Sequence, residues 1–260
     1  MAVVVPDILA RIVDHKRTEL RNISQQRAAL ERTAANRKDV RNFRAALIQS
    51  PPAIISEIKK ASPSKGILSE EFNPAAIAEL YSSGGAAALS VLTDREFFEG
   101  SLDDLLVARA TVNLPVLRKD FTIDEFHVIE AAAHGADAIL LIAALLDEPT
   151  IRRFRELAAH YRMAALVEVH DEAELDRALG SGAEIVGVNN RNLHTFEVTL
   201  ETSLRLAEKI PAGVVKVSES GIHSPADVKR LSAAGFNAFL VGEHLMKSAD
   251  PAAALRELRS

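Results

Sequence analysis

Two kinds of segment alternate along most of the chain. Short apolar runs rich in Val, Ile, Leu and Ala, typical of buried strands, recur from residue 53 onward. The predicted strands are Ala53–Lys59, Ala87–Leu92, Pro115–Lys119, Ala138–Ile142, Ala164–Glu168, Ile185–Asn189, Val214–Ser218 and Ala238–Val241. Amphipathic helical segments lie between them, for example Pro74–Tyr81, Leu102–Ala110, Glu148–His160, Glu172–Leu179 and Pro225–Ala233. This rhythm predicts an α/β fold, a (β/α)8 TIM barrel.

The first fifty residues do not follow that rhythm. Apolar residues at helical spacing among many charges predict one long amphipathic helix over residues 7 to 32, with Pro6-Asp7 as its start signal. A second short helix is predicted around Phe43 to Leu47, ending before Pro51-Pro52. We expect residues 1–50 to form a helical extension that packs on a catalytic barrel of residues 51–260, as a single domain overall.

Four glycines each follow a predicted helix and precede a strand, about two strand–helix units apart. They are Gly85, Gly135, Gly182 and Gly235. Glycine suits a left-handed helix C-cap, and four such caps favour a barrel of paired units. A doubly wound sheet is the alternative, but the glycine-rich first turn that it normally carries is missing. Without GxGxxG or GxxxxGK[ST], we predict neither dinucleotide nor nucleoside-triphosphate binding.

Composition and charge narrow the class of protein. The 260 residues are 48% hydrophobic, enough for a sizeable core, and the formal net charge of −5 disfavours nucleic-acid binding. The absence of Cys excludes disulfides, thiolate nucleophiles and Cys-ligated zinc, and it fits a reducing compartment. No apolar run approaches the ~20 residues that a membrane helix needs, and the N-terminus does not read as a signal peptide. We predict a cytoplasmic protein that binds neither nucleic acid nor membrane.

Polar residues follow the predicted strands at their C-terminal ends, where barrel active sites lie. The fourth strand alone ends without one, and the others deliver Glu57 and Lys59, Thr93 and Asp94, Lys119 and Asp120, Glu168 and His170, Asn189 and Arg191, Glu219 and Ser220, and Gly242 and Glu243. Alternate strand residues share a face, so Lys119 continues the face of Leu117; Glu168 and Glu219 likewise continue Leu166 and Val217. A ring of inward charges above an apolar core predicts shifted pKa values and acid–base chemistry.

Within this ring, two residues have expected roles. Lys119, lying between carboxylates, should stay protonated and suits a general acid or an electrostatic clamp. We expect burial to raise the pKa of Glu168, which comes off an apolar strand, so that it can act as a base.

The last two strand ends suggest a phosphate site. Ser220-Gly221 and Gly242-Glu243 offer small residues and backbone N–H groups where barrels often bind phosphate, with Ser62 and Lys59 able to complete the site. No His, Asp or Glu grouping has metal spacing, so no metal is predicted. Four histidines are expected on helix surfaces: His15, His127, His134 and His160. Lys216 is expected to point out of the barrel toward the helices.

A series of longer motifs covers essentially the whole chain. In order they are Glu57-x-Lys59-x-x-Ser62-Pro63-Ser64-x-Gly66, Leu89-Ser90-Val91-Leu92-Thr93-Asp94 with Phe97-Phe98-x-Gly100, Leu117-Arg118-Lys119-Asp120-Phe121, Leu166-Val167-Glu168-Val169-His170, Gly187-Val188-Asn189-Asn190-Arg191-Asn192-Leu193, Ser218-Glu219-Ser220-Gly221-Ile222 and Phe239-Leu240-Val241-Gly242-Glu243. Their number and order, more than any single one, resemble the indole-3-glycerol phosphate synthase family.

The resemblance implies a carboxy-lyase of tryptophan biosynthesis. Its substrate would be a small phosphosugar, 1-(2-carboxyphenylamino)-1-deoxyribulose 5-phosphate, which the enzyme closes to an indole ring with loss of carbon dioxide and water. Because loss of carbon dioxide restores aromaticity, the resemblance implies no cofactor. It also implies no obligate protein partner.

Site roles also follow from the resemblance, position by position. Lys119 would be the general acid at the ribulose carbonyl, and Glu168 would act in the dehydration with Glu57 and Lys59 as partners. Asn189 and Arg191 would orient this network. Glu219 would lie near the reacting groups, Phe98 and Phe121 beside the anthranilate ring, and Leu240 would also contact the substrate. The implied phosphate ligands are Ser62, Ser220, Gly221, Gly242 and Glu243. The side chain of Glu243 would turn away from the phosphate.

Other functions remain open from the residues alone. One is another phosphosugar barrel enzyme, either like phosphoribosylanthranilate isomerase, which would want a Cys or similar base near the first strand, or a Schiff-base aldolase using Lys119. Another is a barrel that binds a phosphosugar without catalysis, which the intact set of Lys and Glu residues disfavours.

Overall fold

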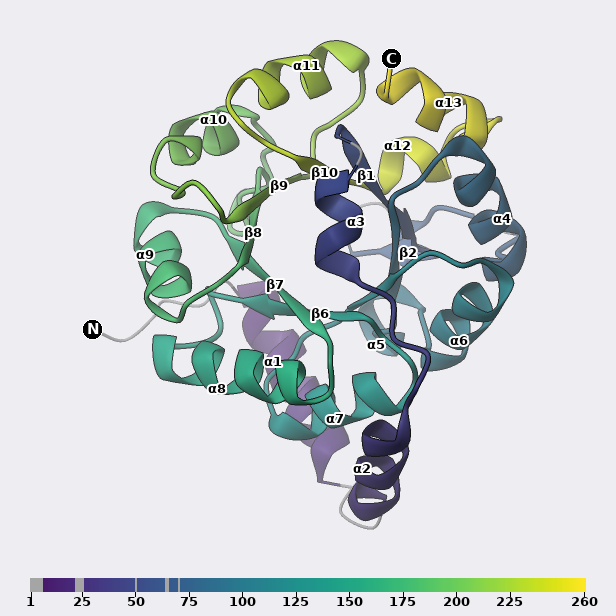
Figure 1. The fold of residues 1–260 in the computed structure, drawn as a ribbon, viewed down its shortest axis with the longest axis vertical. Helices are drawn as coiled ribbons and strands as arrows, with labels where there is room; N and C mark the ends of the chain where they lie inside the picture. Colours follow the sequence, from purple (N-terminus) through teal and green to yellow (C-terminus); the bar gives the residue numbers. More distant parts are fainter. Residues whose placement is uncertain (1–6, 22–25, 50, 64–65, 70) are drawn as a thin grey trace.

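The computed structural model describes residues 7–21, 26–49, 51–63, 66–69 and 71–260, and within them the predicted strands form one closed parallel barrel (Figure 1). The barrel strands are β1 (Ala53–Ile58), β4 (Ala88–Leu92), β5 (Val116–Lys119), β6 (Ala138–Ile142), β7 (Ala164–Val169), β8 (Ile185–Asn189), β9 (Val215–Glu219) and β10 (Ala238–Val241). Each strand pairs with its neighbours in chain order, and β1 closes the ring by pairing with both β4 and β10. The predicted (β/α)8 barrel is confirmed, and the doubly wound alternative is wrong.

Helices surround the barrel as an outer layer (Figure 1). The outer helices are α4 (Pro74–Gly84), α6 (Leu102–Thr111), α7 (Glu125–Ala133), α8 (Glu148–His160), α9 (Glu172–Gly180), α10 (Glu201–Ala207), α11 (Pro225–Ala233) and α13 (Pro251–Leu258). Shorter elements follow three strands: the hairpin β2 (Ala61–Ser62) with β3 (Gly66–Ile67), α5 (Arg95–Phe98) and α12 (Glu243–Met246). None of the described helices is long and apolar enough to cross a membrane.

Local sequence explains where these helices begin and end. Asn73, Asp147 and Ser224 each accept a backbone N–H of the first turn, and a proline follows within the first two helical positions. The four predicted C-terminal glycines all have a positive φ, between 84° and 91°. That is the left-handed conformation that a side chain with a Cβ adopts at a cost.

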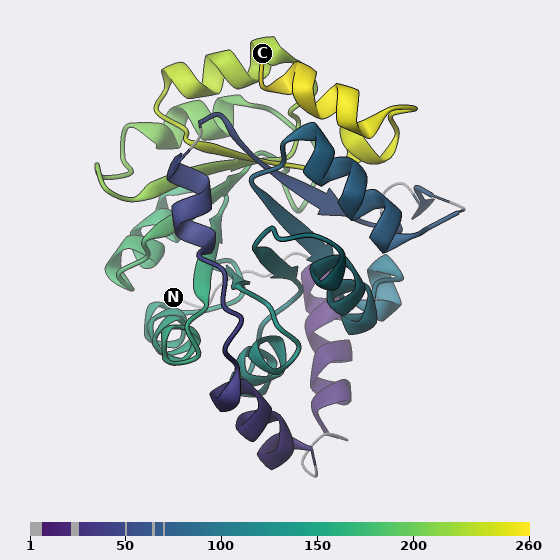
Figure 2. The same ribbon diagram turned by 45° about the vertical axis from the view of Figure 1, so that its right-hand side comes forward.

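The described residues of the N-terminal segment form the helices α1 (Asp7–Leu20), α2 (Arg27–Asn36) and α3 (Phe43–Gln49). The prediction of one helix over residues 7–32 is therefore wrong, because α1 ends at Leu20 and a new helix begins at Arg27. Leu9 and Ile12 of α1 are buried with the barrel interior, whereas α2 packs on α7 (Figure 2). One straight helix cannot present both faces to these separate partners. Pro6, the predicted start signal, lies outside the described residues.

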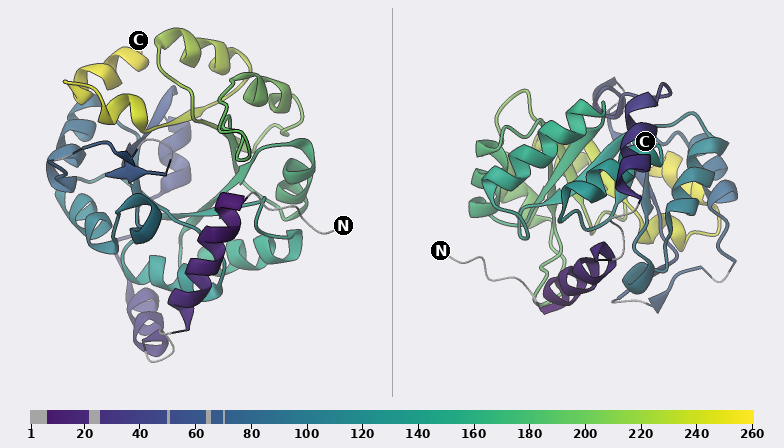
Figure 3. Two further views of the ribbon diagram at one scale, coloured as in Figure 1. Left: turned by 180° about the vertical axis from the view of Figure 1, so that it is seen from behind. Right: turned by 90° about the horizontal axis from the view of Figure 1, so that it is seen from below.

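The barrel interior has its own apolar core, separate from the core between strands and outer helices. Its strand residues include Ile55, Leu117, Leu166 and Val217, together with smaller residues at alternate positions. Helix α3 contributes Phe43 and Leu47 from one end, and α1 contributes Leu9 and Ile12 from the other. Figure 1 shows α3 over the near opening of the barrel, and Figure 3 shows α1 at the opposite opening.

Alternation along the strands carries charged residues into that second opening. Leu117, Leu166 and Val217 belong to the inner core, so Lys119, Glu168 and Glu219, two residues later, continue on the inner face. The shared inward face predicted from the sequence is confirmed. An apolar interior that becomes charged at the strand ends places the site at the C-terminal mouth.

The predictions for the helix histidines and for Lys216 have different outcomes. His127 is only 5% exposed, so its predicted surface position on a helix is wrong; His160 is exposed, and His15 and His134 are half-buried. The Nδ1 of His127 accepts the backbone N–H of Ile123 at 3.2 Å. Lys216 points toward the helices as predicted, and its Nζ donates to the carbonyl of Ala207 at the end of α10.

Candidate active site

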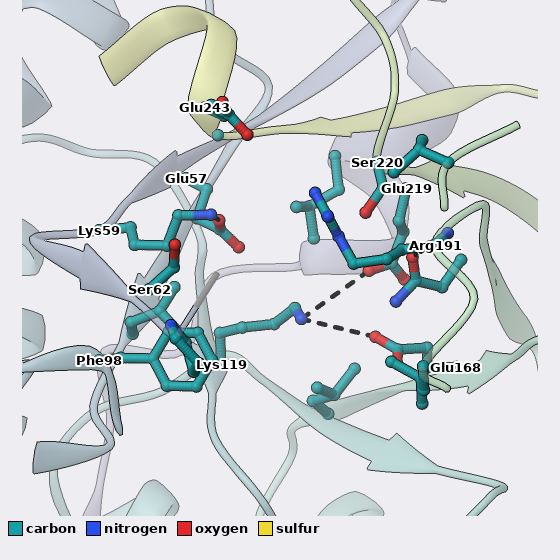
Figure 4. Close-up of a pocket in the computed structure, with 18 of the residues that line it drawn as sticks. Glu57, Lys59, Ser62, Phe98, Lys119, Glu168, Arg191, Glu219, Ser220 and Glu243 are labelled. Carbon is teal, nitrogen blue, oxygen red and sulfur yellow. Dashed lines mark hydrogen bonds and ion pairs between the residues drawn. The ribbon is translucent and has the colours of Figure 1, made fainter. Parts of the chain in front are cut away.

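One pocket occupies the C-terminal mouth of the barrel, and every predicted site residue lines it (Figure 4). They are Glu57, Lys59, Ser62, Phe98, Lys119, Phe121, Glu168, Asn189, Arg191, Glu219, Ser220, Gly221, Leu240, Gly242 and Glu243. The fourth strand, which offers no polar residue, supplies an apolar wall through Leu140 and Ile142. Ser64 of the first motif lies outside the described residues. The barrel thus collects side chains from all of its strands at one place.

Lys119 lies at the end of β5 and reaches across the mouth. Its Nζ is 3.5 Å from Oε2 of Glu168 and 4.0 Å from Oε2 of Glu219 (Figure 4). Burial by itself favours the neutral amine, but Glu168, Glu219 and Glu57 outweigh it and raise the pKa of Lys119 above its usual range. The group is an ammonium ion at neutral pH, as a general acid or an electrostatic clamp requires.

A second ion pair lies at the end of β1. Nζ of Lys59 is 2.7 Å from Oε1 of Glu57, whose side chain is almost fully buried. Burial opposes ionisation, but the charges of Lys59 and Lys119 hold the pKa of Glu57 below its usual value. The carboxylate fits because residue 242 is glycine: a Cβ there would lie 2.4 Å from Oε1 of Glu57. Gly242, predicted as a phosphate ligand, therefore also makes room for Glu57.

The pKa values of the two carboxyl groups beside Lys119 shift in opposite directions, and the prediction that burial raises the pKa of Glu168 is wrong. Burial would raise its pKa, but Lys119, His170 and a hydrogen bond from Asn189 together lower it. Burial and the adjacent charge of Glu168 instead raise the pKa of Glu219 well above its usual value. These opposite shifts favour an ionised Glu168 and a proton on Glu219.

The carboxyl group of Glu219 lies in a space beside Gly187 of β8. A Cβ at residue 187 would lie 2.1 Å from its Oε1, so the carboxyl group occupies space that only a glycine on β8 leaves open. Sequence reasoning missed Gly187 as a site residue. The signal was a glycine inside the apolar run of β8, which often marks a close approach of another group.

The far side of the pocket has a tight turn after β9. Ser220 and Gly221 have φ values of 67° and 79°, so two successive residues adopt left-handed backbone there. A Cβ at Gly221 would lie 2.6 Å from Val198, which leaves no room for a larger residue. Beside this turn α12 begins at Glu243, whose carboxylate pairs with Nζ of Lys247 at 2.6 Å.

Two aromatic rings form the opposite wall. Phe98 of α5 and Phe121, just after β5, have ring centroids 6.1 Å apart at an interplanar angle of 37°. Arg191 enters from the loop after β8, where its backbone N–H donates to Oδ1 of Asn189 at 3.0 Å. The pocket therefore has an aromatic wall, a charged centre and a turn of small residues.

A buried lysine of α1 supports this rim, and sequence reasoning missed it. Nζ of Lys16 lies 3.0 Å from Oδ2 of Asp94 and 2.9 Å from Oδ1 of Asp120, which follow β4 and β5. The side chain is 5% exposed. Burial works against its charge, but the carboxylates raise the pKa of Lys16 above its usual range. The available signal was position: Lys16 is four residues after Ile12, on the same face of the helix.

The fold and this pocket define the class of a barrel enzyme that works by acid–base chemistry on a small substrate. No group of three His, Asp or Glu side chains in the described part of the chain could hold a metal ion. The family model for indole-3-glycerol phosphate synthase matches residues 9–258. The chain belongs to the indole-3-glycerol phosphate synthase family, which comprises carboxy-lyases of tryptophan biosynthesis.

Relatives match nearly full length. The chain is 52% identical over 258 residues to the indole-3-glycerol phosphate synthase of Polaromonas naphthalenivorans (strain CJ2), with 97% of this chain and 98% of that protein covered. Identity to the enzyme of the same name from Aromatoleum aromaticum is also 52%, with the same coverage.

Solved structures with little sequence similarity share the barrel. Thiamine phosphate pyrophosphorylase from Pyrococcus furiosus superposes with a TM-score of 0.62 at 19% identity, over 84% of this chain and 96% of that one. KGPDC from Streptococcus mutans gives 0.59 at 14% identity, over 79% of this chain and 94% of that one. At such identities the likeness concerns the fold alone.

Proposed function

We propose that this pocket closes the indole ring of 1-(2-carboxyphenylamino)-1-deoxy-D-ribulose 5-phosphate and forms indole-3-glycerol phosphate, carbon dioxide and water. The observation that carries the proposal is the ammonium group of Lys119, held between Glu168 and Glu219, whose pKa values shift in opposite directions. Acid and base groups thus lie within a few ångströms of each other, which a ring closure followed by dehydration requires.

Substrate orientation would come from the two sides of the pocket. The phosphate would bind at the turns of Ser220-Gly221 and Gly242-Glu243, largely through backbone N–H groups, with Ser62 completing the site. The anthranilate ring would lie against Phe98 and Phe121. Leu240 would pack on the substrate from the inner face of β10. Anchoring both ends bends the chain between them, so that the ring carbon and the ribulose carbonyl carbon can meet.

Lys119 would act in the first step. As the aromatic carbon attacks the carbonyl carbon, the carbonyl oxygen gains negative charge, and the ammonium group gives it a proton. The carboxyl group then leaves as carbon dioxide, and its bonding electrons restore the aromatic ring.

Dehydration would use the remaining groups. Ionised Glu168 accepts the proton that the substrate loses, with Asn189 donating a hydrogen bond to its carboxylate and Arg191 supporting Asn189. Lys59, paired with Glu57, gives a proton to the departing hydroxyl group, which leaves as water. Glu219, whose pKa is raised by burial and by its interaction with Glu168, would hold Glu168 toward Lys119.

The Schiff-base alternative is disfavoured by the same geometry. An aldolase lysine must present a neutral amine to a carbonyl carbon, whereas the surrounding carboxylates keep the proton on Lys119. The isomerase alternative would want a Cys base near β1, and the chain has no Cys. A cytoplasmic location for this small-molecule enzyme is part of the proposal.

Replacement of Lys119 tests the assignment. In Lys119→Ala, kcat should fall about 10²–10⁴-fold, because the general acid is lost. Product binding by calorimetry should remain, since the phosphate and ring contacts are intact. Lys216→Ala, on the outer face of β9, is the matched control and should keep its turnover. Indole fluorescence follows the reaction, and unchanged turnover in Lys119→Ala would remove Lys119 from the mechanism.

A further inference from the structure

A histidine outside the proposed mechanism links Glu168 to α9. Nδ1 of His170 is 2.9 Å from Oε2 of Glu174, and the same oxygen accepts the backbone N–H of His170 at 2.9 Å. On the other side of the ring, Nε2 lies 3.5 Å from Oε1 of Glu168. Nε2 is buried, and no group among the described residues forms a hydrogen bond with it. The ring thus stands between two carboxyl groups.

Proton counting limits the states of this group. The Glu174 carboxylate accepts from Nδ1, so Nδ1 carries a hydrogen. A neutral ring would then direct the lone pair of Nε2 at an oxygen of Glu168, which repels it when Glu168 is ionised. Attraction requires a proton between Nε2 and Oε1. An ionised Glu168 therefore attracts His170 only when both ring nitrogens carry a proton.

We propose that His170 is a positioning residue for Glu168, an imidazolium that keeps this carboxylate ionised and aimed at Lys119. The two cations contact different oxygens: His170 faces Oε1, and Lys119 faces Oε2 (Figure 4 shows the second contact). The carboxylate is therefore held from both sides. This inference rests on the proposed role of Glu168 in dehydration.

The groups around His170 support its charge. Burial lowers the pKa of the ring, but Glu174 on α9, Glu168 on β7 and Asp171 at the N-cap of α9 outweigh it and raise the pKa above its ordinary value. Asp171 also fixes Glu174 by accepting its backbone N–H at 2.8 Å. In return, the ring cation lowers the pKa of Glu168, second only to Lys119 among the charges.

The pH profile distinguishes positioning from support of the fold. In His170→Asn the cation next to Glu168 is lost, so the acid limb of kcat should move up by about 1 pH unit. KM should stay within about 2-fold, because His170 does not touch the phosphate or ring contacts. His170→Gln can place an uncharged N–H near Nε2; it should show the same shift but retain more of the maximal kcat. His134→Asn, at the end of α7, is the matched control and should leave the profile unchanged.

Nitrogen NMR of the wild-type ring gives a result that does not depend on a variant. Both ring nitrogens of His170 should be protonated at pH 6, with a pKa above 6.5. A ring with one proton at pH 6, or an unmoved acid limb in His170→Asn, would overturn the proposal. Glu168→Gln separates the two hypotheses: normal turnover there would refute the role of Glu168 itself, whereas lost turnover with an unmoved limb in His170→Asn refutes only the role of His170.

Discussion

The close contact between Glu219 and Gly187 predicts the effect of replacing this glycine. In Gly187→Ala the new Cβ would lie 2.1 Å from Oε1 and 3.2 Å from Cδ of Glu219, and 3.1 Å from Leu166. Because a relaxed contact needs about 3.4 Å or more, the carboxyl group must move by about 1 Å. Residues 185–188 of β8 are all buried, so the displacement has little room to spread.

A displacement of that size is large for catalysis. A misplacement of ~1 Å can cost about 10²-fold even when it starts in a group that only positions the catalytic residues, so kcat should fall by roughly that factor. KM should change little, since the phosphate turn and the aromatic wall are on other elements. Overpacking should also lower the free energy of unfolding by about 1–3 kcal/mol. Indole fluorescence gives the kinetic constants, and urea unfolding gives the stability.

A second substitution tests whether the clash is the cause. Glu219→Asp shortens the side chain by one methylene and withdraws it from the new Cβ. In the Glu219→Asp background, Gly187→Ala should therefore cost at most a few-fold in kcat. An equal loss in both backgrounds, or a kcat in Gly187→Ala within 2-fold of wild type, would refute the steric reasoning.

The remaining predictions concern stability. Lys16→Met leaves Asp94 and Asp120 buried without their cation, so it should lower the free energy of unfolding by about 3–5 kcal/mol. The control is Arg17→Met at the exposed neighbouring residue, which should change the free energy of unfolding by less than about 0.5 kcal/mol. Urea titrations measure both values. Burial and Arg118 depress the pKa of His127 from 6.5 to about 4, so the unfolded chain binds its proton first as pH falls. His127 should therefore lower the free energy of unfolding by up to ~3 kcal/mol between pH 6.5 and pH 4. In His127→Asn the free energy of unfolding, measured with urea, should depend less on pH in this range. An unchanged pH dependence would contradict the buried neutral ring.

The sequence was informative wherever a short-range pattern decides the structure. Strand runs such as Ile185–Asn189 need only alternation and apolar content, and their predicted bounds agree with the structure within a residue or two. Glu57, Lys119 and Glu168 could be placed in one mouth because strand parity fixes their face.

The failures came from interactions between distant segments. Glu168 and Glu219 are both carboxyl groups at the ends of apolar strands, and nothing local says which of them is stabilised in its ionised form by Lys119 and Asn189. In the sequence Lys16 is one charge among many, because its partners Asp94 and Asp120 approach it only in the folded protein. The end of α1 at Leu20 depends on the separate docking of α2 on α7, which a propensity pattern cannot reveal.

The helices at the two openings of the barrel have a consequence for biosynthesis. Helix α3 rests on β1, β4 and β9, and Lys16 of α1 needs Asp94 and Asp120. During synthesis α1 and α3 leave the ribosome before the barrel strands, and the last strand under α3 emerges only after residue 215. The nascent chain must therefore carry α3 without one of its strands until β9 is made, and α1 without its carboxylate partners until Asp120 is made. Their apolar faces are the surfaces that a chaperone would meet first.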